Sequence, residues 1–158
     1  MTYPRKHRGY QYEGEPRLVM TPDGVTIEFK GTQPVMDNGL ENAALISLFT
    51  DRGWWGNALL KSDEQIGKTN FEKVASGTIN IGMLAQTANE ARLALKWMVS
   101  LKIVQSVDAR AYNRNGFGVD VEIIITGLDG SSKAFKVSKY GANWTSQVID
   151  PAQARLTP

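Results

Sequence analysis

The sequence predicts a single α+β domain: an N-terminal β-hairpin and two main helices packed on a three-stranded antiparallel meander, with extended termini. Its 158 residues are 42% apolar and 22% charged, which is typical of one soluble domain. The strongest helical periodicity in the chain comes before three stretches of alternating apolar and polar residues. Because helices and strands are grouped rather than alternating, the pattern favours α+β architecture.

The first 17 residues show neither helical nor strand periodicity, so we expect an extended arm there. The arm contains Tyr10 and Tyr12, and tyrosine is enriched where a segment docks on a partner. A frayed terminus is the alternative interpretation. The sequence thus predicts an arm over 1–17, a core domain over 18–141 and a C-terminal extension over 142–158, where the strand pattern fades.

A short hairpin is expected directly after the arm. Its strands, Leu18–Met20 and Val25–Phe29, flank the turn sequence Thr21–Gly24, which has proline early and glycine late. Apolar and polar residues alternate along the second strand, which predicts one buried face. The residues expected on that face are Val25, Ile27 and Phe29.

Two helices come next. The first is expected to start at Asp37 or Asn38, either of which can cap it, and to run to about Thr50. The second is expected from Thr78, its predicted cap, to Leu101. Its apolar stripe consists of Leu84, Ala88, Ala91, Leu95 and Met98. Between the helices we expect a loop with one short helical turn around Asn70–Ala75.

Three strands form the predicted meander, near 107–112, 119–126 and 135–138. A three-residue loop at Leu128–Gly130 sets the register of the last two strands. The resulting pairs are Ile123 with Phe135, Val121 with Val137, and Glu122 with Lys136. The apolar pairs then share one face and the charged pair lies on the other, as a half-buried sheet requires.

The last predicted strand, near Ala134–Tyr140, contains three lysines, which are common on edge strands. One interpretation is that these lysines only maintain solubility. The other is a guarded edge that accepts a strand from a chosen partner. On the second interpretation, the partner-binding residues are Phe135, Lys136, Val137 and Tyr140.

The residue inventory gives little support for catalysis. The chain has no cysteine and one histidine, His7, and its Gly67–Thr69 segment lacks the earlier glycine of a phosphate-binding loop. We therefore expect no catalytic, cofactor-binding or metal-ligating residues. Residues 1–17 contain four basic and two acidic residues, which accounts for the whole net charge of +2. The neutral body argues against nucleic acid as a partner, and the absence of a long apolar run argues against a membrane.

Trp54 and Trp55 are the most informative aromatic pair. Adjacent side chains on irregular backbone seldom point the same way, so we expect one ring to plug the loop and the other to be exposed. An exposed tryptophan is a frequent anchor of protein interfaces. The sequence does not distinguish which ring has which role.

Several segments resemble the Mu-type phage small baseplate wedge protein family. The most specific likeness is the Leu-Phe-Thr-Asp-Arg run followed by Gly-Trp-Trp-Gly, and the resemblance spans roughly Asp23 to Tyr140. The segments concerned are Asp37–Ala43, Leu45–Arg52, Gly53–Gly56, Glu90–Leu95 and Leu128–Ser131.

The resemblance implies a structural protein of a contractile tail, similar to the sheath-initiating wedge proteins of T-even phages. Implied partners are the larger wedge proteins, the tail sheath subunits and the central hub or tube, with six copies in a ring. The implied location is the virion tail baseplate, after assembly in the host cytoplasm. Two alternatives remain: a peptidoglycan-degrading glycan hydrolase, and a small nucleic-acid-binding domain that uses the basic arm.

Overall fold

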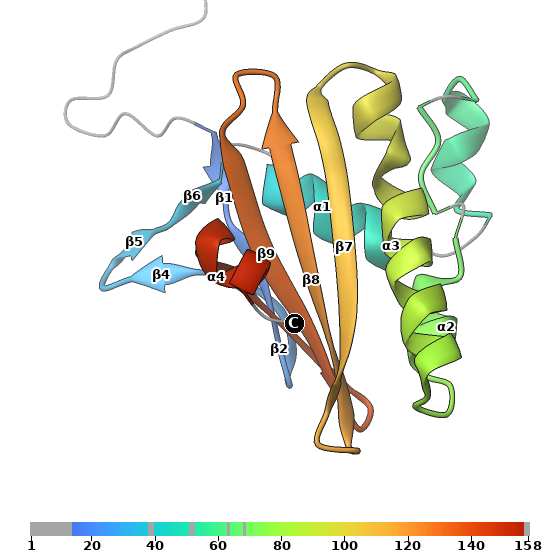
Figure 1. The fold of residues 1–158 in the computed structure, drawn as a ribbon. Helices are drawn as coiled ribbons and strands as arrows, with labels where there is room; N and C mark the ends of the chain where they lie inside the picture. Colours follow the sequence, from blue (N-terminus) through green and yellow to red (C-terminus); the bar gives the residue numbers. More distant parts are fainter. Residues whose placement is uncertain (1–13, 38–39, 51–52, 63, 68, 157–158) are drawn as a thin grey trace, which may run out of the picture.

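The computed structural model describes residues 14–37, 40–50, 53–62, 64–67 and 69–156 (Figure 1). Its centre is an antiparallel sheet in the order β10-β9-β8-β7. The sheet strands are β7 (Val104–Arg114), β8 (Gly118–Gly127), β9 (Ser132–Tyr140) and β10 (Asn143–Ile149). The helices are α1 (Leu40–Phe49), α2 (Phe71–Ala75), α3 (Ile81–Ser100) and α4 (Pro151–Leu156), with the 3-10 helix η1 (Trp55–Leu59).

The predicted layout of two helices on a three-stranded meander is wrong. The sheet has a fourth strand, β10, which pairs with β9 from Asn143↔Tyr140 to Ile149↔Ala134. Helix α4 follows it and packs Ala154 against Ile124. The chain after Tyr140 therefore belongs to the sheet and its cover, although it was expected to have lost its regular pattern.

The predicted pairing of β8 with β9 is confirmed, including Ile123↔Phe135, Val121↔Val137 and Glu122↔Lys136. The apolar members of these pairs lie on the core face, where they are almost fully buried. Figure 1 shows α1 behind the sheet and α4 in front of it. The main core thus lies between the sheet and helices α1, α2 and α3.

Helices α1 and α3 begin where a side chain accepts a hydrogen bond from one of their first backbone amides. The Asp37 carboxylate accepts a hydrogen bond from the Asn42 backbone N–H at 3.0 Å, so one of the two predicted capping residues has this role for α1. The cap of α3 lies two residues later than expected, because Asn80 rather than Thr78 caps the helix. The Asn80 Oδ1 accepts from the Met83 N–H at 2.9 Å. Helix α2 confirms the expected helical turn.

Small paired strands attach the N-terminal part to this body. They are β1 (Glu15–Pro16) with β6 (Met36–Asp37), β2 (Leu18–Thr21) with β3 (Gly24–Ile27), and β4 (Phe29–Lys30) with β5 (Gln33–Pro34). The Asn42 side chain ties them to α1. Its Oδ1 accepts from the Leu18 N–H at 2.7 Å, and its Nδ2 donates to the Pro16 carbonyl at 2.9 Å.

The β2–β3 hairpin forms where the sequence predicts it, but its apolar face is not buried as expected. Val25 is 62% exposed, and Ile27 and Phe29 are also exposed. The hairpin lies along β10, where the Met20 N–H donates to the Ser146 Oγ at 2.9 Å. The alternation of apolar and polar residues therefore identified the apolar face correctly. It could not show that none of the elements that the structure describes covers this face. Within the described part of the chain, no helix has the length and apolarity needed to cross a bilayer.

Candidate interaction surfaces

The Gly-Trp-Trp-Gly motif begins a small projecting unit that we call the tryptophan lobe, residues 53–62 and 64–67. Gly53 has φ +81°, a conformation that L side chains rarely adopt. The Trp54 ring then folds back over Gly56, where an added Cβ would lie 2.3 Å from the ring. Both glycines are therefore required by the local geometry rather than by a ligand.

Asn57 holds the lobe closed. Its Nδ2 donates to the Ile66 carbonyl at 2.6 Å, and its Oδ1 accepts from the Ile66 N–H at 3.0 Å. The Gln65 side chain donates to the Asn57 carbonyl at 3.1 Å. One asparagine therefore joins the two ends of the lobe through both of its side-chain polar atoms.

The structure shows that both tryptophans are exposed, Trp55 much more than Trp54. Trp54 is 38% exposed because its ring covers Gly56, whereas Trp55 is 75% exposed. Leu59, one helical turn further on, is 81% exposed. Sequence reasoning missed Leu59. The signal available was the apolar run of Ala58, Leu59 and Leu60 directly after the motif.

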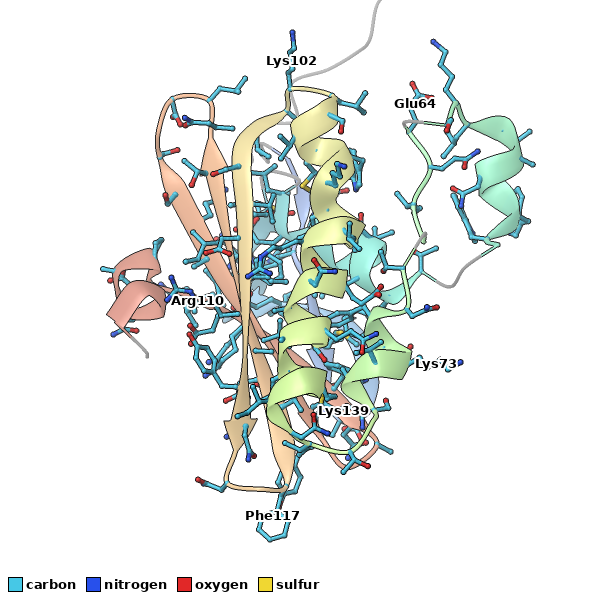
Figure 2. The ribbon with its side chains drawn as sticks, turned by 45° about the vertical axis from the view of Figure 1, so that its right-hand side comes forward. Glu64, Lys73, Lys102, Arg110, Phe117 and Lys139 are labelled. Atoms are coloured by element: carbon cyan, nitrogen blue, oxygen red, sulfur yellow. The ribbon has the colours of Figure 1, made fainter. Side chains whose placement is uncertain are left out.

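A cleft of about 290 Å³ separates the lobe from α3, and Figure 2 shows the lobe beside that helix. Two polar side chains at the cleft already make hydrogen bonds. The Glu90 Oε2 accepts from the Asn70 N–H at 2.8 Å, and the Trp97 Nε1 donates to the Ser47 Oγ at 3.0 Å. The half-exposed Leu93 side chain also lines it. The cleft can therefore receive an apolar side chain.

The strand predicted to be a guarded edge is not at an edge. β9 lies between β8 and β10, so its backbone groups pair on both sides. Phe135 and Val137 are buried in the core, while Lys136 is half-buried and Tyr140 is 60% exposed. The expectation of an open strand edge at 134–140 is therefore wrong. Contact of Lys136 or Tyr140 with a partner stays a prediction.

Two strands end the sheet among those described: β7, which pairs only with β8, and β10, which pairs only with β9. At the opposite side of the sheet, the β2–β3 hairpin lies against β10. The sequence predicted a strand at β7 but did not identify it as an edge strand. The reason is that β10, which pairs with β9, was not predicted.

The face of the sheet that α4 partly covers is polar. Glu122 lies there between Arg110 and Lys136 on the neighbouring strands. Burial raises the pKa of the Glu122 carboxyl above its ordinary value, while the Lys136 ammonium opposes this shift. Asp120 adds to the increase as a like charge.

A second apolar surface is a groove of about 220 Å³ between the β2–β3 hairpin and α1. Val25, Ile46 and Phe49 are among its lining residues, and Ile46 is 49% exposed. Tyr10 and Tyr12, the arm residues predicted to contact a partner, lie outside the described residues. Among the residues that the structure describes, no three His, Cys, Asp or Glu side chains gather as a metal site.

Comparison with known proteins gives one informative relative. No family model matches the chain, and no solved structure matches it significantly. The chain is 30% identical over 126 residues to the Mu-like prophage FluMu protein gp46 of Haemophilus influenzae. That alignment covers 73% of this chain and 87% of the relative. On this identity and coverage, the chain belongs to the family of the Mu-like prophage protein gp46.

Proposed function

We propose that this Mu-like phage protein is a non-enzymatic wedge subunit of a contractile tail baseplate. In this role it clamps the larger wedge proteins and starts the first sheath ring by pairing one strand edge with a sheath subunit. Kinship with a Mu-like prophage protein supports a structural or assembly role in a phage. The motif resemblance around the tryptophan lobe supports the finer assignment to the baseplate.

The observation on which the proposal rests is the single-sided pairing of β7. This strand has 11 residues, Val104–Arg114, and β8 is its one neighbour among the described strands. A strand with one unpaired side can add a strand from another chain through backbone hydrogen bonds. Such a joint needs little sequence specificity, and repetition around a ring strengthens it through avidity.

The clamp on the wedge proteins is assigned to the tryptophan lobe. Trp55 and Leu59 project from a unit that its own hydrogen bonds keep rigid. Exposed aromatic side chains on a rigid support lose little conformational entropy on binding, which is typical of interface anchors. The lobe lies beside α3, whereas the sheath joint uses β7, so both contacts can form at once.

Ala111→Pro tests the sheath joint. In an antiparallel pair the backbone groups alternate between the partner strand and the open side. The Ala109 N–H and carbonyl bind side chains rather than β8, so those of Ala111, two residues later, face the open side. Proline there removes an outward N–H and leaves the β7–β8 ladder complete, as edge strands tolerate. We expect baseplates to form without sheath, counted by electron microscopy after induction of the phage with the variant supplied in trans.

Ala111→Ser, which keeps the N–H, is the matched control and should support normal sheath. Thermal unfolding must show that both variants fold. Normal sheath on a folded Ala111→Pro variant would contradict the joint at β7. Failure of the chain to copurify with the large wedge proteins would contradict the wedge assignment itself. Clearing of peptidoglycan in a zymogram would instead support the hydrolase alternative.

A further inference from the structure

The middle of the β7 edge is already occupied by side chains. Arg92, on α3, donates from Nη2 to the Ala109 carbonyl, and its Nε donates to the Asp108 Oδ1 at 3.1 Å. The same Asp108 oxygen accepts the Ala109 backbone N–H at 2.8 Å. Both outward backbone groups of Ala109 are therefore satisfied without a neighbouring strand.

This arrangement divides the edge. Since outward groups recur at every second residue, those of Val107 and Ala111 face the same side as those of Ala109. An arriving strand can pair with β7 on either side of Ala109. At Ala109 it meets the Arg92 guanidinium, which reaches across the edge from the helix-covered face.

The charge at this point is unbalanced. Arg110 places its Nε 3.9 Å from the Asp108 Oδ2, so two guanidinium groups share one carboxylate, while Glu122 lies between Arg110 and Lys136. Arg92, Arg110 and Lys136 together face Asp108 and Glu122, which leaves one positive charge in excess. Arg110 extends toward the α4 side of the sheet in Figure 2, so the two arginines approach Asp108 from opposite faces. All three side chains are 42–51% exposed, so a partner can displace them at small cost.

We propose that Arg92, Asp108 and Arg110 form a selectivity cluster on the β7 edge, which rejects a second copy of this chain and admits an extended acidic segment. Two copies that paired β7 with β7 around a two-fold axis at Ala109 would bring two cationic clusters together. Their Ala109 groups would also have no hydrogen bond to gain. A segment with a carboxylate facing Ala109 instead pairs with the excess positive charge. This carboxylate then takes the place of Asp108 as the partner of Arg92.

The first test is self-association of the isolated chain, which needs no phage and so is separable from the proposed function. We expect wild type to stay monomeric, and Arg92→Ala to form a dimer that grows with concentration, by light scattering after size exclusion. Arg92→Ala with Ala111→Pro should return to monomer, because the open side of β7 is then interrupted. Arg114→Ala is the matched control. Its guanidinium pairs with Asp120 at 3.7 Å, away from Ala109, so the variant should remain monomeric.

The second test uses two fluorescent peptides of alternating valine and threonine, one with a central glutamate and one with a central lysine. We expect anisotropy to show about tenfold tighter binding of the glutamate peptide to wild type, equivalent to about 1.4 kcal/mol. The preference should fall in Arg92→Ala. A strictly monomeric Arg92→Ala would overturn the proposal, as would equal binding of the two peptides.

Should Ala111→Pro fail to fold, hydrogen exchange at Val107 and Ala111 in the Arg92→Ala dimer locates the joint instead. Unprotected amides there would also overturn it.

Discussion

Gly56 determines the shape of the tryptophan lobe because its bare Cα is the surface on which the Trp54 ring rests. Its contacts explain why the motif has glycine on both sides of the tryptophan pair. The first glycine provides a positive φ, and the second provides space. Trp54 serves the lobe itself, which leaves Trp55 available for a partner.

Gly56→Ala should therefore displace the Trp54 ring. The added methyl would lie within 2.5 Å of three ring carbons, and overpacking of this kind costs about 1–3 kcal/mol. We expect a red shift of tryptophan emission and faster proteolysis within the lobe, with a smaller change in the global unfolding midpoint. Leu59→Ala, at an exposed position of the same lobe, is the control. An unchanged spectrum for Gly56→Ala would contradict the ring placement.

Glu122 makes stability depend on pH. Its folded-state pKa lies above the ordinary value of 4.5, so the folded state binds the proton more tightly than the unfolded state. The resulting stabilisation is complete below the unfolded pKa and is lost as pH rises through the folded pKa. Glu122→Gln removes this loss, so its stability relative to wild type should increase as pH rises above the ordinary carboxyl pKa of 4.5, measured in denaturant titrations.

Lys136→Met is a control in which the pH dependence of stability should change in the opposite direction to that in Glu122→Gln. Without the ammonium, the Glu122 pKa rises further, and the loss of stability with pH becomes larger than in wild type. A pH-independent difference between Glu122→Gln and wild type would show that desolvation does not dominate at this carboxyl.

Among the elements, β10 has a larger role than its sequence suggests. It places Trp144 in an aromatic cluster with Phe49 and Phe71, with ring centroids 5.0 and 5.6 Å away. Trp144 is 7% exposed. The strand therefore completes the core as well as the sheet.

Truncation after Gly141, the end of the predicted core domain, tests this role. It removes Trp144, and loss of one buried large aromatic side chain alone costs about 3–5 kcal/mol. We expect the truncated chain to be unfolded or aggregated by circular dichroism and size exclusion. Truncation after Asp150 removes only α4 and should leave a folded protein with a lower melting temperature. A cooperative melt for the shorter chain would show that β10 is dispensable.

β9 and β10 differ in how many apolar side chains they bury, and this explains why only β9 could be predicted from the sequence. β9 buries Phe135 and Val137 on one face, so its alternation is clear and its register with β8 could be predicted. β10 buries Trp144 but leaves Val148 46% exposed. Edge strands with a single buried side chain have too weak a pattern to detect. The missed strand also made β9 look like the edge.

For the molecule as a whole, the sequence predicted an exposed tryptophan ring but not the position of the open edge. The exposed ring follows from local geometry, namely four consecutive residues and their glycines. The edge depends on strand order, which is set by packing between distant segments. Arg92 could not be assigned to the edge either, because its contact with Ala109 requires the placement of α3 against β7.

Trp55→Ala combined with Leu59→Ala tests the lobe as an anchor for the whole assembly. Both side chains are exposed, so unfolding free energy should change by less than about 0.5 kcal/mol. Loss of an interface anchor costs about 2 kcal/mol or more, and the double variant should fail to capture the large wedge proteins in pull-downs. Phe117→Ala, exposed at the β7–β8 hairpin tip in Figure 2, is the control and should capture them normally. Equal capture by all three proteins would remove the lobe from the interface.

The hydrogen bond from Met20 to Ser146 joins positions 126 residues apart. The ribosome therefore makes the β2–β3 hairpin long before it makes the strand on which the hairpin rests. At about 5–20 residues per second, the hairpin waits roughly 6–25 s for β10 to be synthesised. Throughout that interval Met20, which packs against the main core in the finished fold, lacks its partner strand, so we expect nascent chains crowded on one messenger RNA to associate through this hairpin.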